Sequence, residues 1–519
     1  MKRRQLLRSG AAAALTVPAG LAGPLAFGRS PDASPSATAP SAVPSTTPSA
    51  ESSPVTAFRD LFADPVEARG PTVAEFRGRL PAGLRGTLYR NGPARMQRGG
   101  LHYRHWFDGD GMAQSFVFDA GRLTHRAAMI RTAKYVEEER AGRFLRATFG
   151  TPMPDGAPVL RPDDLNVANI SVLPVGDELL ALWEAGSAYR IDPRDLSTLG
   201  RKVWSPDTDG APFSAHPRVG PDGTVWSFGY MTGSGKLLLY QVQRDGRLAR
   251  TGLIDAPNAD MVHDFAVTER HLVFLLMPLL ADEGGPVPGG AFIDRFRWHG
   301  DRPSVVLIVD KQSLQVVQRA ELPAMAVFHL GNAWEERGTV RLQFVRVADF
   351  DRSMRDIVAA TTGQPTHGRD ASQVHDIRVD LASGRASAER LSELYAEFPR
   401  FDPRHVGRRT SALFVASRSP TMQRGLFGFN GVARMDLQTG AVQRFSYGDS
   451  VIAEEHVFVP RAGGREGEGW LVGTALDWRA RRTRVSVLDA SRLPDGPIAQ
   501  ASLPYLLPPG LHGAWVAGA

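Results

Sequence analysis

The chain has 519 residues, of which 42% are hydrophobic and 22% charged, and it contains 53 glycines and 38 prolines. This composition is typical of a turn-rich globular protein and excludes a disordered or collagen-like chain. No cysteine occurs, which excludes disulfide scaffolds, thiol nucleophiles, Cys-ligated zinc and iron–sulfur clusters, so any metal must be held by His, Asp or Glu. The net charge of +6 is spread along the chain, and no nucleic-acid partner is indicated.

The N-terminal segment has the features of an export signal. Paired arginines at positions 3 and 4 precede an apolar stretch over residues 11–25, which Pro18 interrupts. Residues 1–28 resemble a twin-arginine (Tat) signal peptide, which predicts an exported protein, periplasmic or extracellular. The alternative is a membrane anchor, although a spanning helix needs ~20 uninterrupted apolar residues.

The rest of the chain divides into a linker and one folded domain. Residues 29–56 are almost wholly Ser, Pro, Ala and Thr, a composition with nothing to bury, and are predicted to be a disordered linker. Residues 57–519 show short alternating strands, such as 225–228 and 305–309, separated by turn residues. We predict an all-β domain over this range.

An Asp-containing turn recurs along this domain. A strand ends in Asp, and small or polar residues lead into the next strand, at an average separation of about 62 residues. This spacing predicts a seven-bladed β-propeller with long loops, although Asp-turn hairpins also recur in other all-β folds. The seven aspartates are Asp119, Asp192, Asp245, Asp310, Asp380, Asp436 and Asp489.

Four histidines share one phase relative to these turns. His216, His263, His329 and His512 each follow one of the aspartates by 18 to 24 residues. At that distance each should lie on the innermost strand of the next blade, beside the central axis, where the four imidazoles would converge. The alternative for any single one is a buried structural histidine. His456 follows Asp436 by 20 residues and is the one other candidate that this distance does not exclude. Strand alternation, however, would send only one of Glu455 and His456 inward.

Ten ordered motifs give the chain a resemblance to the carotenoid cleavage oxygenases over nearly its whole mature length. The most specific is HWFDGDGM, whereas RNGP alone would be a weak signal. The motifs are RNGP (90–93), HWFDGDGM (105–112), NVAN (166–169), LWE (182–184), AHP (215–217), HDF (263–265), HLGNAWE (329–335), EFPR (397–400), FVPR (458–461) and PGLHG (509–513).

The resemblance implies a seven-bladed propeller with a loop and helix cap over a non-haem Fe(2+) on its axis. The implied metal ligands are His216, His263, His329 and His512. Three glutamates would accept the other ring N–H of three of these ligands, and by motif they are Glu184, Glu397 and Glu455. Glu454 stands beside Glu455 and competes with it. Each glutamate could instead be a solvated carboxylate at a strand end.

The implied reaction needs no catalytic residue beyond the metal centre. Imidazole suits iron, copper, zinc and nickel alike, so four histidines do not choose the metal. Four ligands on an octahedral ion leave two positions, for O2 and for water or substrate, whereas a structural tetrahedral zinc would be closed. The expected activity is cleavage of a conjugated C=C bond of a carotenoid or apocarotenoid with O2, giving two carbonyl products.

Two segments bear on the substrate. Lys134 matches a lysine that binds the phenol in lignostilbene-type members, so cleavage of the central double bond of phenolic stilbenes is the alternative function. The Phe149-Gly150-Thr151 segment resembles apocarotenoid-cleaving members, which we favour. We interpret Asp108 and Asp110 of HWFDGDGM as parts of a tight turn rather than as catalytic acids.

The expected partners are a lipophilic small molecule and O2, in a monomer. The apolar run 274–280 could line a substrate tunnel, dip into a membrane surface as a peripheral contact, or lie in the core. Two other classes of function stay open: a non-catalytic binding propeller, and isomerase or hydrolase chemistry without O2 incorporation. A non-catalytic propeller would be expected to have lost some of the seven metal-site matches.

Overall fold

The computed structural model describes residues 53–63, 66–285, 287–366 and 372–518. The predicted signal peptide, 1–28, and most of the predicted linker lie outside the described residues. Residues 53–56 form a turn in which the backbone N–H of Ala57 donates to the carbonyl of Ser53, so the folded region begins slightly before position 57. No helix within the described ranges is long and apolar enough to cross a membrane.

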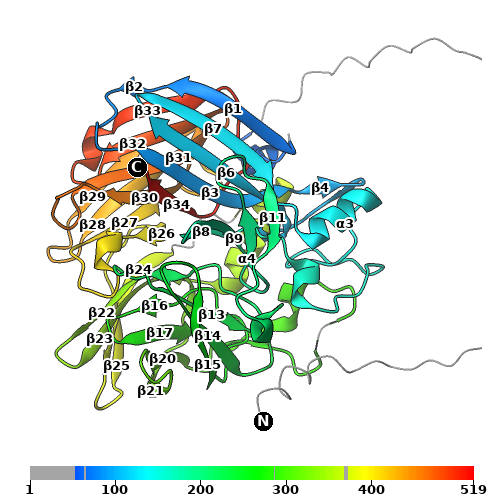
Figure 1. The fold of residues 1–519 in the computed structure, drawn as a ribbon, viewed down its shortest axis with the longest axis vertical. Coiled ribbons are helices and arrows are strands. Elements are labelled where there is room, and N and C mark those ends of the chain that lie inside the picture. The colour runs from blue at the N-terminus through cyan, green and yellow to red at the C-terminus, as the bar shows by residue number, and fades with distance from the viewer. Residues whose placement is uncertain (1–52, 64–65, 286, 367–371, 519) are drawn as a thin grey trace, which may run out of the picture. The chain divides into compact units, whose positions relative to one another are not determined.

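Seven antiparallel sheets of four or five strands are arranged as the blades of a propeller, as predicted (Figure 1). The first blade contains β34 (Gly513–Ala517), β3 (Gly86–Arg95), β6 (Asp110–Asp119), β7 (Arg122–Met129) and β1 (Ala68–Glu75). The next three contain β8 (Ser171–Val175), β9 (Glu178–Leu182), β10 (Tyr189–Ile191) and β11 (Thr198–Arg201); β12 (Arg218–Val219), β13 (Val225–Tyr230), β14 (Lys236–Val242) and β15 (Leu248–Asp255); and β16 (Ala266–Val267), β17 (His271–Leu276), β20 (Ser304–Asp310) and β21 (Val316–Leu322). The last three contain β22 (Ala326–Glu336), β23 (Thr339–Val347), β24 (Gln373–Asp380) and β25 (Ala386–Arg390); β26 (Ala396–Arg400), β27 (Ala412–Ser417), β28 (Gly431–Asp436) and β29 (Val442–Ser446); and β30 (Val451–Pro460), β31 (Gly469–Asp477), β32 (Arg482–Asp489), β33 (Pro497–Leu503) and β2 (Arg77–Gly78).

Strands from the two ends of the domain close the ring of blades. The C-terminal strand β34 pairs antiparallel with β3 near the N-terminus, from Arg90–Gly513 to Gly86–Ala517 (Figure 1). The short strand β2 in turn pairs with β33 of the last blade. Because each pairing joins distant parts of the sequence, the two together tie the last blade to the first.

The Asp-turn repeat marks the same connection in every blade. With β34 counted as the first strand of its blade, all seven aspartates lie at the turn between the third and fourth strands. In six of the described turns the Asp carboxylate accepts a backbone N–H two or three residues ahead, as Asp192 does from Arg194 at 2.9 Å. This local hydrogen bond explains why Asp recurs there.

Apolar side chains of neighbouring blades form the core. Phe228 of β13 packs against Phe274 of β17 with ring centroids 5.3 Å apart, and Phe265 packs on both. Of the three fates open to the run 274–280, the structure shows burial in the core: residues 274–277 and Leu279 are at most 3% exposed, and none of the run lines the main cavity.

Helices and small sheets are few. The helices are α2 (Ala57–Asp60), α3 (Ala133–Ala141) and α4 (Phe350–Thr362); the 3₁₀ turns are η1 (Trp106–Asp108), η2 (Pro162–Leu165), η3 (Pro206–Thr208), η4 (Phe292–Arg295), η5 (Pro403–His405) and η6 (Leu493–Asp495). Two hairpins lie outside the blades, β4 (Gln97–Arg98) with β5 (Leu101–His102), and β18 (Leu279–Ala281) with β19 (Phe296–Trp298). The predicted cap stays a prediction, although Phe58 of α2 and Ile357 of α4 do line the main cavity.

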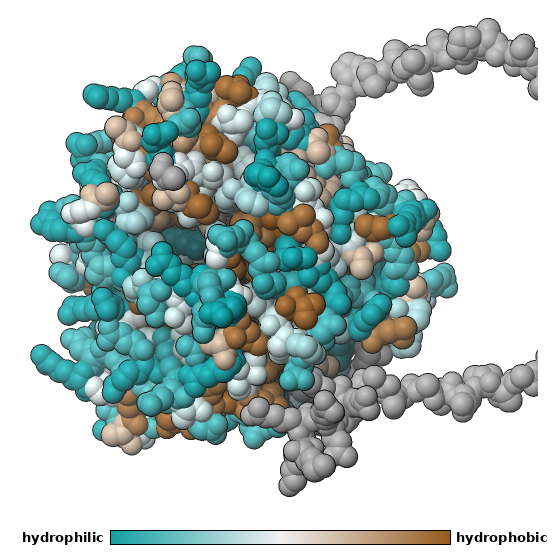
Figure 2. Space-filling view, viewed as in Figure 1, coloured by the Kyte–Doolittle hydropathy of each residue, from teal (hydrophilic) through white to brown (hydrophobic). Residues whose placement is uncertain are grey.

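The surface seen in Figure 2 is mostly hydrophilic, with hydrophobic residues in small groups between the polar ones. This distribution agrees with the even spread of charged residues along the sequence.

Buried histidines make the stability of the fold depend on pH. His125 of β7 is 0% exposed, and burial lowers its pKa to about 3. In the unfolded chain the His pKa is ~6.5, so below that pH the unfolded chain binds a proton that the folded chain does not bind. The free energy of unfolding therefore falls as the pH drops from ~6.5 towards 3. At pH 5 this cost is about 2 kcal/mol for His125.

His125→Gln should therefore lose less stability between pH 7.5 and pH 5 than the parent chain, by about 2 kcal/mol. Urea unfolding at the two pH values measures this difference. The same pH dependence in both proteins would contradict the prediction.

Candidate metal centre

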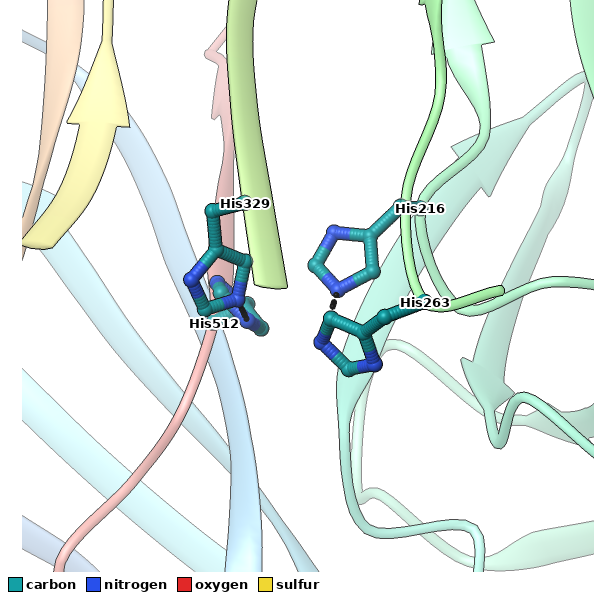
Figure 3. A group of neighbouring side chains, drawn as sticks. All are labelled: His216, His263, His329 and His512. Carbon is teal, nitrogen blue, oxygen red and sulfur yellow. Dashed lines mark hydrogen bonds between the residues drawn. The ribbon is translucent and has the colours of Figure 1, made fainter. Parts of the chain in front are cut away.

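Four imidazoles converge near the axis of the propeller. One ring nitrogen from each of His216, His263, His329 and His512 lies within 4.8 Å of the others. His216 and His263 approach from one side, and His329 and His512 from the other (Figure 3). These are the four histidines that the phase argument selected, and the structure brings all of them together.

The innermost strands of four blades position these histidines. His216, His263 and His512 lie in the residues just before β12, β16 and β34, respectively, and His329 lies within β22. The β22–β23 pairing shifts register between Val327 and Leu330, around His329. Such an irregularity re-aims a side chain that regular pleating would direct elsewhere.

The ring nitrogens have the spacing that a cation needs. The Nε2 atoms of His216 and His263 are 3.0 Å apart, and those of His329 and His512 are 3.1 Å apart. Two nitrogens bound ~2.1 Å from one ion at a right angle lie ~3.0 Å from each other. The donor set therefore fits a metal ion held by nitrogen alone.

Three glutamates orient three of the rings. The Nδ1–H of His329 donates to Glu397 at 2.6 Å, that of His512 donates to Glu455 at 2.9 Å, and that of His263 donates to Glu184. A carboxylate can only accept, so each pair places the proton on Nδ1 and leaves Nε2 free to bind a metal. The structure thus places Glu184, Glu397 and Glu455 as the resemblance implied.

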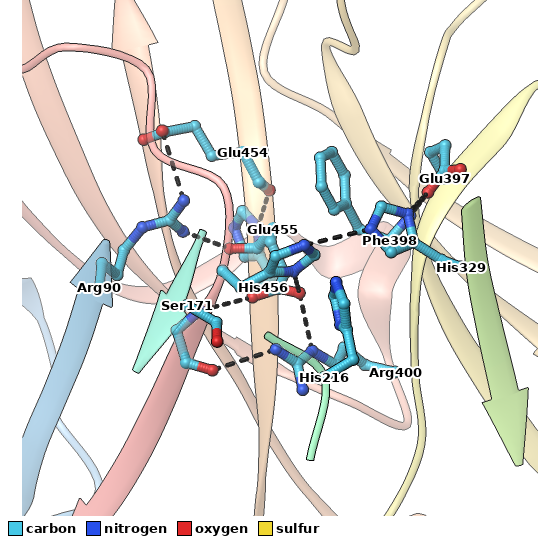
Figure 4. Close-up of polar contacts among 12 residues, drawn as sticks. Arg90, Ser171, His216, His329, Glu397, Phe398, Arg400, Glu454, Glu455 and His456 are labelled. Carbon is cyan, nitrogen blue, oxygen red and sulfur yellow. Dashed lines mark hydrogen bonds and ion pairs between the residues drawn. The ribbon is translucent and has the colours of Figure 1, made fainter. Parts of the chain in front are cut away.

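A bulge in β30 decides between the neighbours of Glu455. The β30–β31 register shifts between Ala453 and His456. Glu454 accepts from Thr474 and from the backbone N–H of Gly510, rather than from a ligand histidine. The ring of His456 is bonded to the Tyr447 hydroxyl at 2.8 Å and to the backbone carbonyl of Glu454, two residues before it (Figure 4 shows the second contact). His456 is not part of the cluster.

Burial and the close packing of charges set the protonation states of the cluster. Burial lowers the pKa of His216 well below its ordinary value, and the other imidazoles lower it further. Burial also disfavours charge on His329, but Glu397, together with Asp264 and Glu455, outweighs burial and raises the pKa of His329. Glu397 and Glu455 are buried too, yet His329 beside the first and Arg400 beside the second hold both pKa values below the ordinary range. The carboxylates therefore stay ionised.

Two residues near the cluster were not identified from the sequence. The Nε of Arg400 donates to Glu455 at 2.8 Å (Figure 4), and the hydroxyl of Tyr230 donates to Glu184 at 2.5 Å. Arg400 ends the EFPR motif, which could have drawn attention to it. Tyr230 ends β13 in another blade from Glu184 and has no local signal, because only the fold brings the two together.

A cavity of about 780 Å³ opens on the cluster. His263, His329 and His512 form part of its wall, together with the carboxylates Glu184 and Glu397. Most of the remaining wall is apolar or aromatic, a composition and size typical of small-molecule sites. Its aromatic residues are Phe58, Trp106, Phe107, Phe149, Trp183, Tyr230, Phe292, Phe328, Tyr395, Phe398, Phe427 and Phe429.

The HWFDGDGM segment has the structural role predicted for it. Its first residues form the 3₁₀ turn η1, and Asp108 accepts from the backbone of Gly150 at 2.8 Å and from the hydroxyl of Thr151 at 2.5 Å. A Cβ on Gly111 would lie 2.4 Å from the carbonyl oxygen of Ala168, so only glycine fits there. The turn holds Phe107 and Phe149 on the cavity wall.

Lys134 does not reach the cavity, which corrects its assignment as a substrate contact. Its side chain is 0% exposed, and its ammonium group donates to Asp110 at 2.9 Å, Glu138 at 2.8 Å and Tyr103 at 3.2 Å. Neither Lys134 nor Tyr103 is among the residues that line the cavity. Two carboxylates already neutralise the lysine, so its role is structural.

Comparison with known proteins agrees with the family resemblance found in the sequence. The family model of RPE65, the retinal pigment epithelial membrane protein, matches residues 62–517. The apocarotenoid-15,15'-oxygenase of Synechocystis is 31% identical over 460 residues, which cover 85% of this chain and 92% of that protein.

Solved structures agree with this match. The cobalt-substituted Synechocystis apocarotenoid oxygenase has a TM-score of 0.80 at 28% identity, covering 90% of this chain and 99% of that one. The lignostilbene dioxygenase of Pseudomonas brassicacearum has a TM-score of 0.77 at 28% identity, with coverage of 88% and 98%. The chain therefore belongs to the RPE65 family and is an oxidoreductase of the carotenoid-oxygenase type.

Proposed function

We propose that the chain is a non-haem iron(II) dioxygenase that cleaves a conjugated C=C bond of a carotenoid or apocarotenoid with O2, releasing two carbonyl products. The observation that carries this proposal is that three of the four clustered histidines form part of the wall of an aromatic-lined cavity. A substrate in the cavity would lie directly beside the metal. When bound, ferrous iron would supply the binding and activation of O2.

The residues of this chain would prepare the site rather than react. Glu184, Glu397 and Glu455 fix the imidazole rings and raise their basicity. The apolar walls would exclude water and hold an extended polyene through its faces. A neighbour whose structure is cobalt-substituted supports a metal in this chain, and non-haem Fe(II) with open positions is the usual centre of oxygenases.

A polyene is favoured over a phenolic stilbene. Lys134, the residue that favoured a phenolic substrate, is buried away from the cavity and paired with two carboxylates. Phe149, from the segment that resembles apocarotenoid-cleaving members, does line the cavity. Stilbene cleavage remains the second candidate because a lignostilbene dioxygenase is among the structural neighbours.

Parallel assays of the two substrate classes test the proposal. The protein reconstituted with Fe(2+) is offered an apocarotenal and a 4-hydroxystilbene under ¹⁸O2, and the products are identified by mass spectrometry. We expect cleavage of the apocarotenal with label in the carbonyl products, and metal analysis giving one iron per chain. Unlabelled products would indicate hydrolase or isomerase chemistry. Turnover of the stilbene far above that of every apocarotenoid would favour the second candidate. Stoichiometric zinc without iron-dependent activity would exclude an iron enzyme.

Replacing the carboxylates that hold the rings should weaken metal binding without unfolding the chain. Removing such a partner costs ~10-fold to 100-fold in metal affinity or activity, so Glu184→Gln, Glu397→Gln and Glu455→Gln should each raise the metal dissociation constant by about that factor. Competition with a chromogenic chelator measures the affinity.

The chain offers a matched control for these variants. Glu335 also accepts from an Nδ1, that of His271 at 2.8 Å, but His271 is not in the cluster. Glu335→Gln should leave metal affinity unchanged. Equal affinities in all four variants and the parent would refute the role of the three glutamates.

We also propose export of the folded protein through the twin-arginine pathway. The paired arginines and the interrupted apolar stretch of residues 1–28 support it. A fusion of residues 1–56 to a reporter should be exported in a Tat-competent host, and Arg3→Lys with Arg4→Lys should retain the reporter in the cytoplasm. Export of the double variant would argue against the pathway.

A further inference from the structure

One guanidinium on the cavity wall has no hydrogen-bond or ion-pair partner among the described residues. Arg161, Arg295 and Arg418 line the cavity. Arg161 pairs with Asp164 at 3.2 Å, and Arg418 donates to the carbonyl of Leu426 at 3.0 Å. Within the described part of the chain, the guanidinium of Arg295 forms no hydrogen bond or ion pair, and its Nε is buried.

The surroundings of Arg295 do not neutralise it. Asp260 is the acidic group whose field reaches it, but the two oxygens of Asp260 already accept the backbone N–H groups of Gly233 at 2.8 Å and Ala281 at 3.0 Å. The guanidinium carbon lies 5.5 Å from the ring centroid of Phe292. Burial lowers the pKa of Arg295, although an arginine remains charged at neutral pH.

The backbone holds this arginine in place. Arg295 ends η4, and the N–H groups of Phe292 and Ile293 donate to the carbonyls of Thr148 and Phe149 at 2.9 and 2.8 Å. Its own carbonyl accepts from Asp282 at 2.7 Å, beside the β18–β19 hairpin. The backbone that carries the cation is therefore fixed before any ligand binds, which lowers the entropic cost of binding one.

We infer that Arg295 recognises an anionic end group of the substrate, and that the preferred substrates are polyenes with a terminal carboxylate, such as apocarotenoid acids. A guanidinium matches the planar geometry of a carboxylate and binds it through two parallel N–H···O bonds. In an apolar cavity such a pair is screened less than in water. A neutral aldehyde or alcohol accepts from the same group without the charge. The inference rests on the proposed function for the cleavage step, but not for binding.

Anaerobic binding tests the inference without turnover. Retinoic acid and retinal share a carbon skeleton and differ in the end group, and their binding to the iron-loaded protein is followed by quenching of the tryptophans Trp106 and Trp183, which line the cavity. We expect retinoic acid to bind more tightly. Arg295→Met should raise its Kd roughly tenfold to 150-fold, the worth of a lost charge-assisted hydrogen bond, and should change the Kd of retinal by less than about twofold.

Two further variants separate charge recognition from a general disturbance. Arg297→Met, two residues along, removes an exposed arginine that pairs with Asp282 and does not line the cavity, so it should change neither Kd. Arg295→Lys should recover part of the retinoic acid affinity, because it keeps the charge but loses the bidentate geometry. Equal loss of both ligands in Arg295→Met, or no loss of either, would overturn the inference.

An aerobic arm distinguishes this inference from the proposed function. If neither apocarotenoid acids nor aldehydes are cleaved while the Arg295-dependent preference for retinoic acid persists, the proposed function fails and the recognition site stands. If polyenes are cleaved but acid and aldehyde bind alike in the parent and Arg295→Met, the proposed function stands and the inference fails.

Discussion

Replacing His329 with Ala is expected to abolish metal binding and oxygenase turnover together. The variant removes one of four clustered nitrogens and leaves the partly buried Glu397 without the ring that it orients. The same result is expected for His216→Ala, His263→Ala and His512→Ala, with turnover falling to background. Elemental analysis of the reconstituted variants and O2 consumption in the presence of substrate measure the two losses.

His456 provides the control for these four variants. It is buried near the cluster, but its ring is held by the Tyr447 hydroxyl and by the backbone carbonyl of Glu454 rather than directed at the other imidazoles. His456→Gln should keep stoichiometric metal, even if its thermal stability falls because a buried hydrogen bond is lost. Loss of metal from His456→Gln with retention in His512→Ala would reverse the assignment.

Lys134→Met is expected to destabilise the fold by about 3 to 5 kcal/mol, the cost of breaking a buried ion pair by removing one partner. The substitution leaves Asp110 and Glu138 as buried carboxylates without their common cation, in side chains that are 1% and 0% exposed. Urea unfolding monitored by fluorescence measures the change in the free energy of unfolding.

A second variant tests whether the cost comes from the uncompensated charges. Lys134→Met combined with Glu138→Gln removes one of the two charges and should recover part of the lost stability. Turnover of an apocarotenal per folded molecule should stay unchanged in Lys134→Met, because the lysine does not line the cavity. A selective rise in the KM for 4-hydroxystilbene with unchanged stability would restore Lys134 as a substrate contact.

The sequence alone predicted the propeller and its four histidines for a local reason. Each Asp-turn is a contact between residues two or three positions apart, so it can be recognised in the sequence. Each blade contains one such turn, so the number of turns gives the number of blades. Because blade length is roughly regular, a fixed distance from each turn reaches the innermost strand of the next blade. His216, His263, His329 and His512 satisfy that distance, and the structure confirms that they meet.

The three glutamates came from the resemblance to a family rather than from spacing. Strand alternation could tell that Glu455 and His456 face opposite sides, but it could not choose between Glu454 and Glu455. The bulge between Ala453 and His456 made that choice, since it breaks the regular alternation within β30.

Only the tertiary structure decided what Tyr230, Lys134 and Arg295 do. Tyr230 depends on Glu184 from another blade, and Lys134 depends on Asp110 from β6. For Arg295 the deciding fact is that its guanidinium has no hydrogen-bond or ion-pair partner among the described residues. The sequence around Lys134 is the same whether its ammonium group faces a cavity or two buried carboxylates. The difference lies in burial and charge pairing, which arise when the blades pack together.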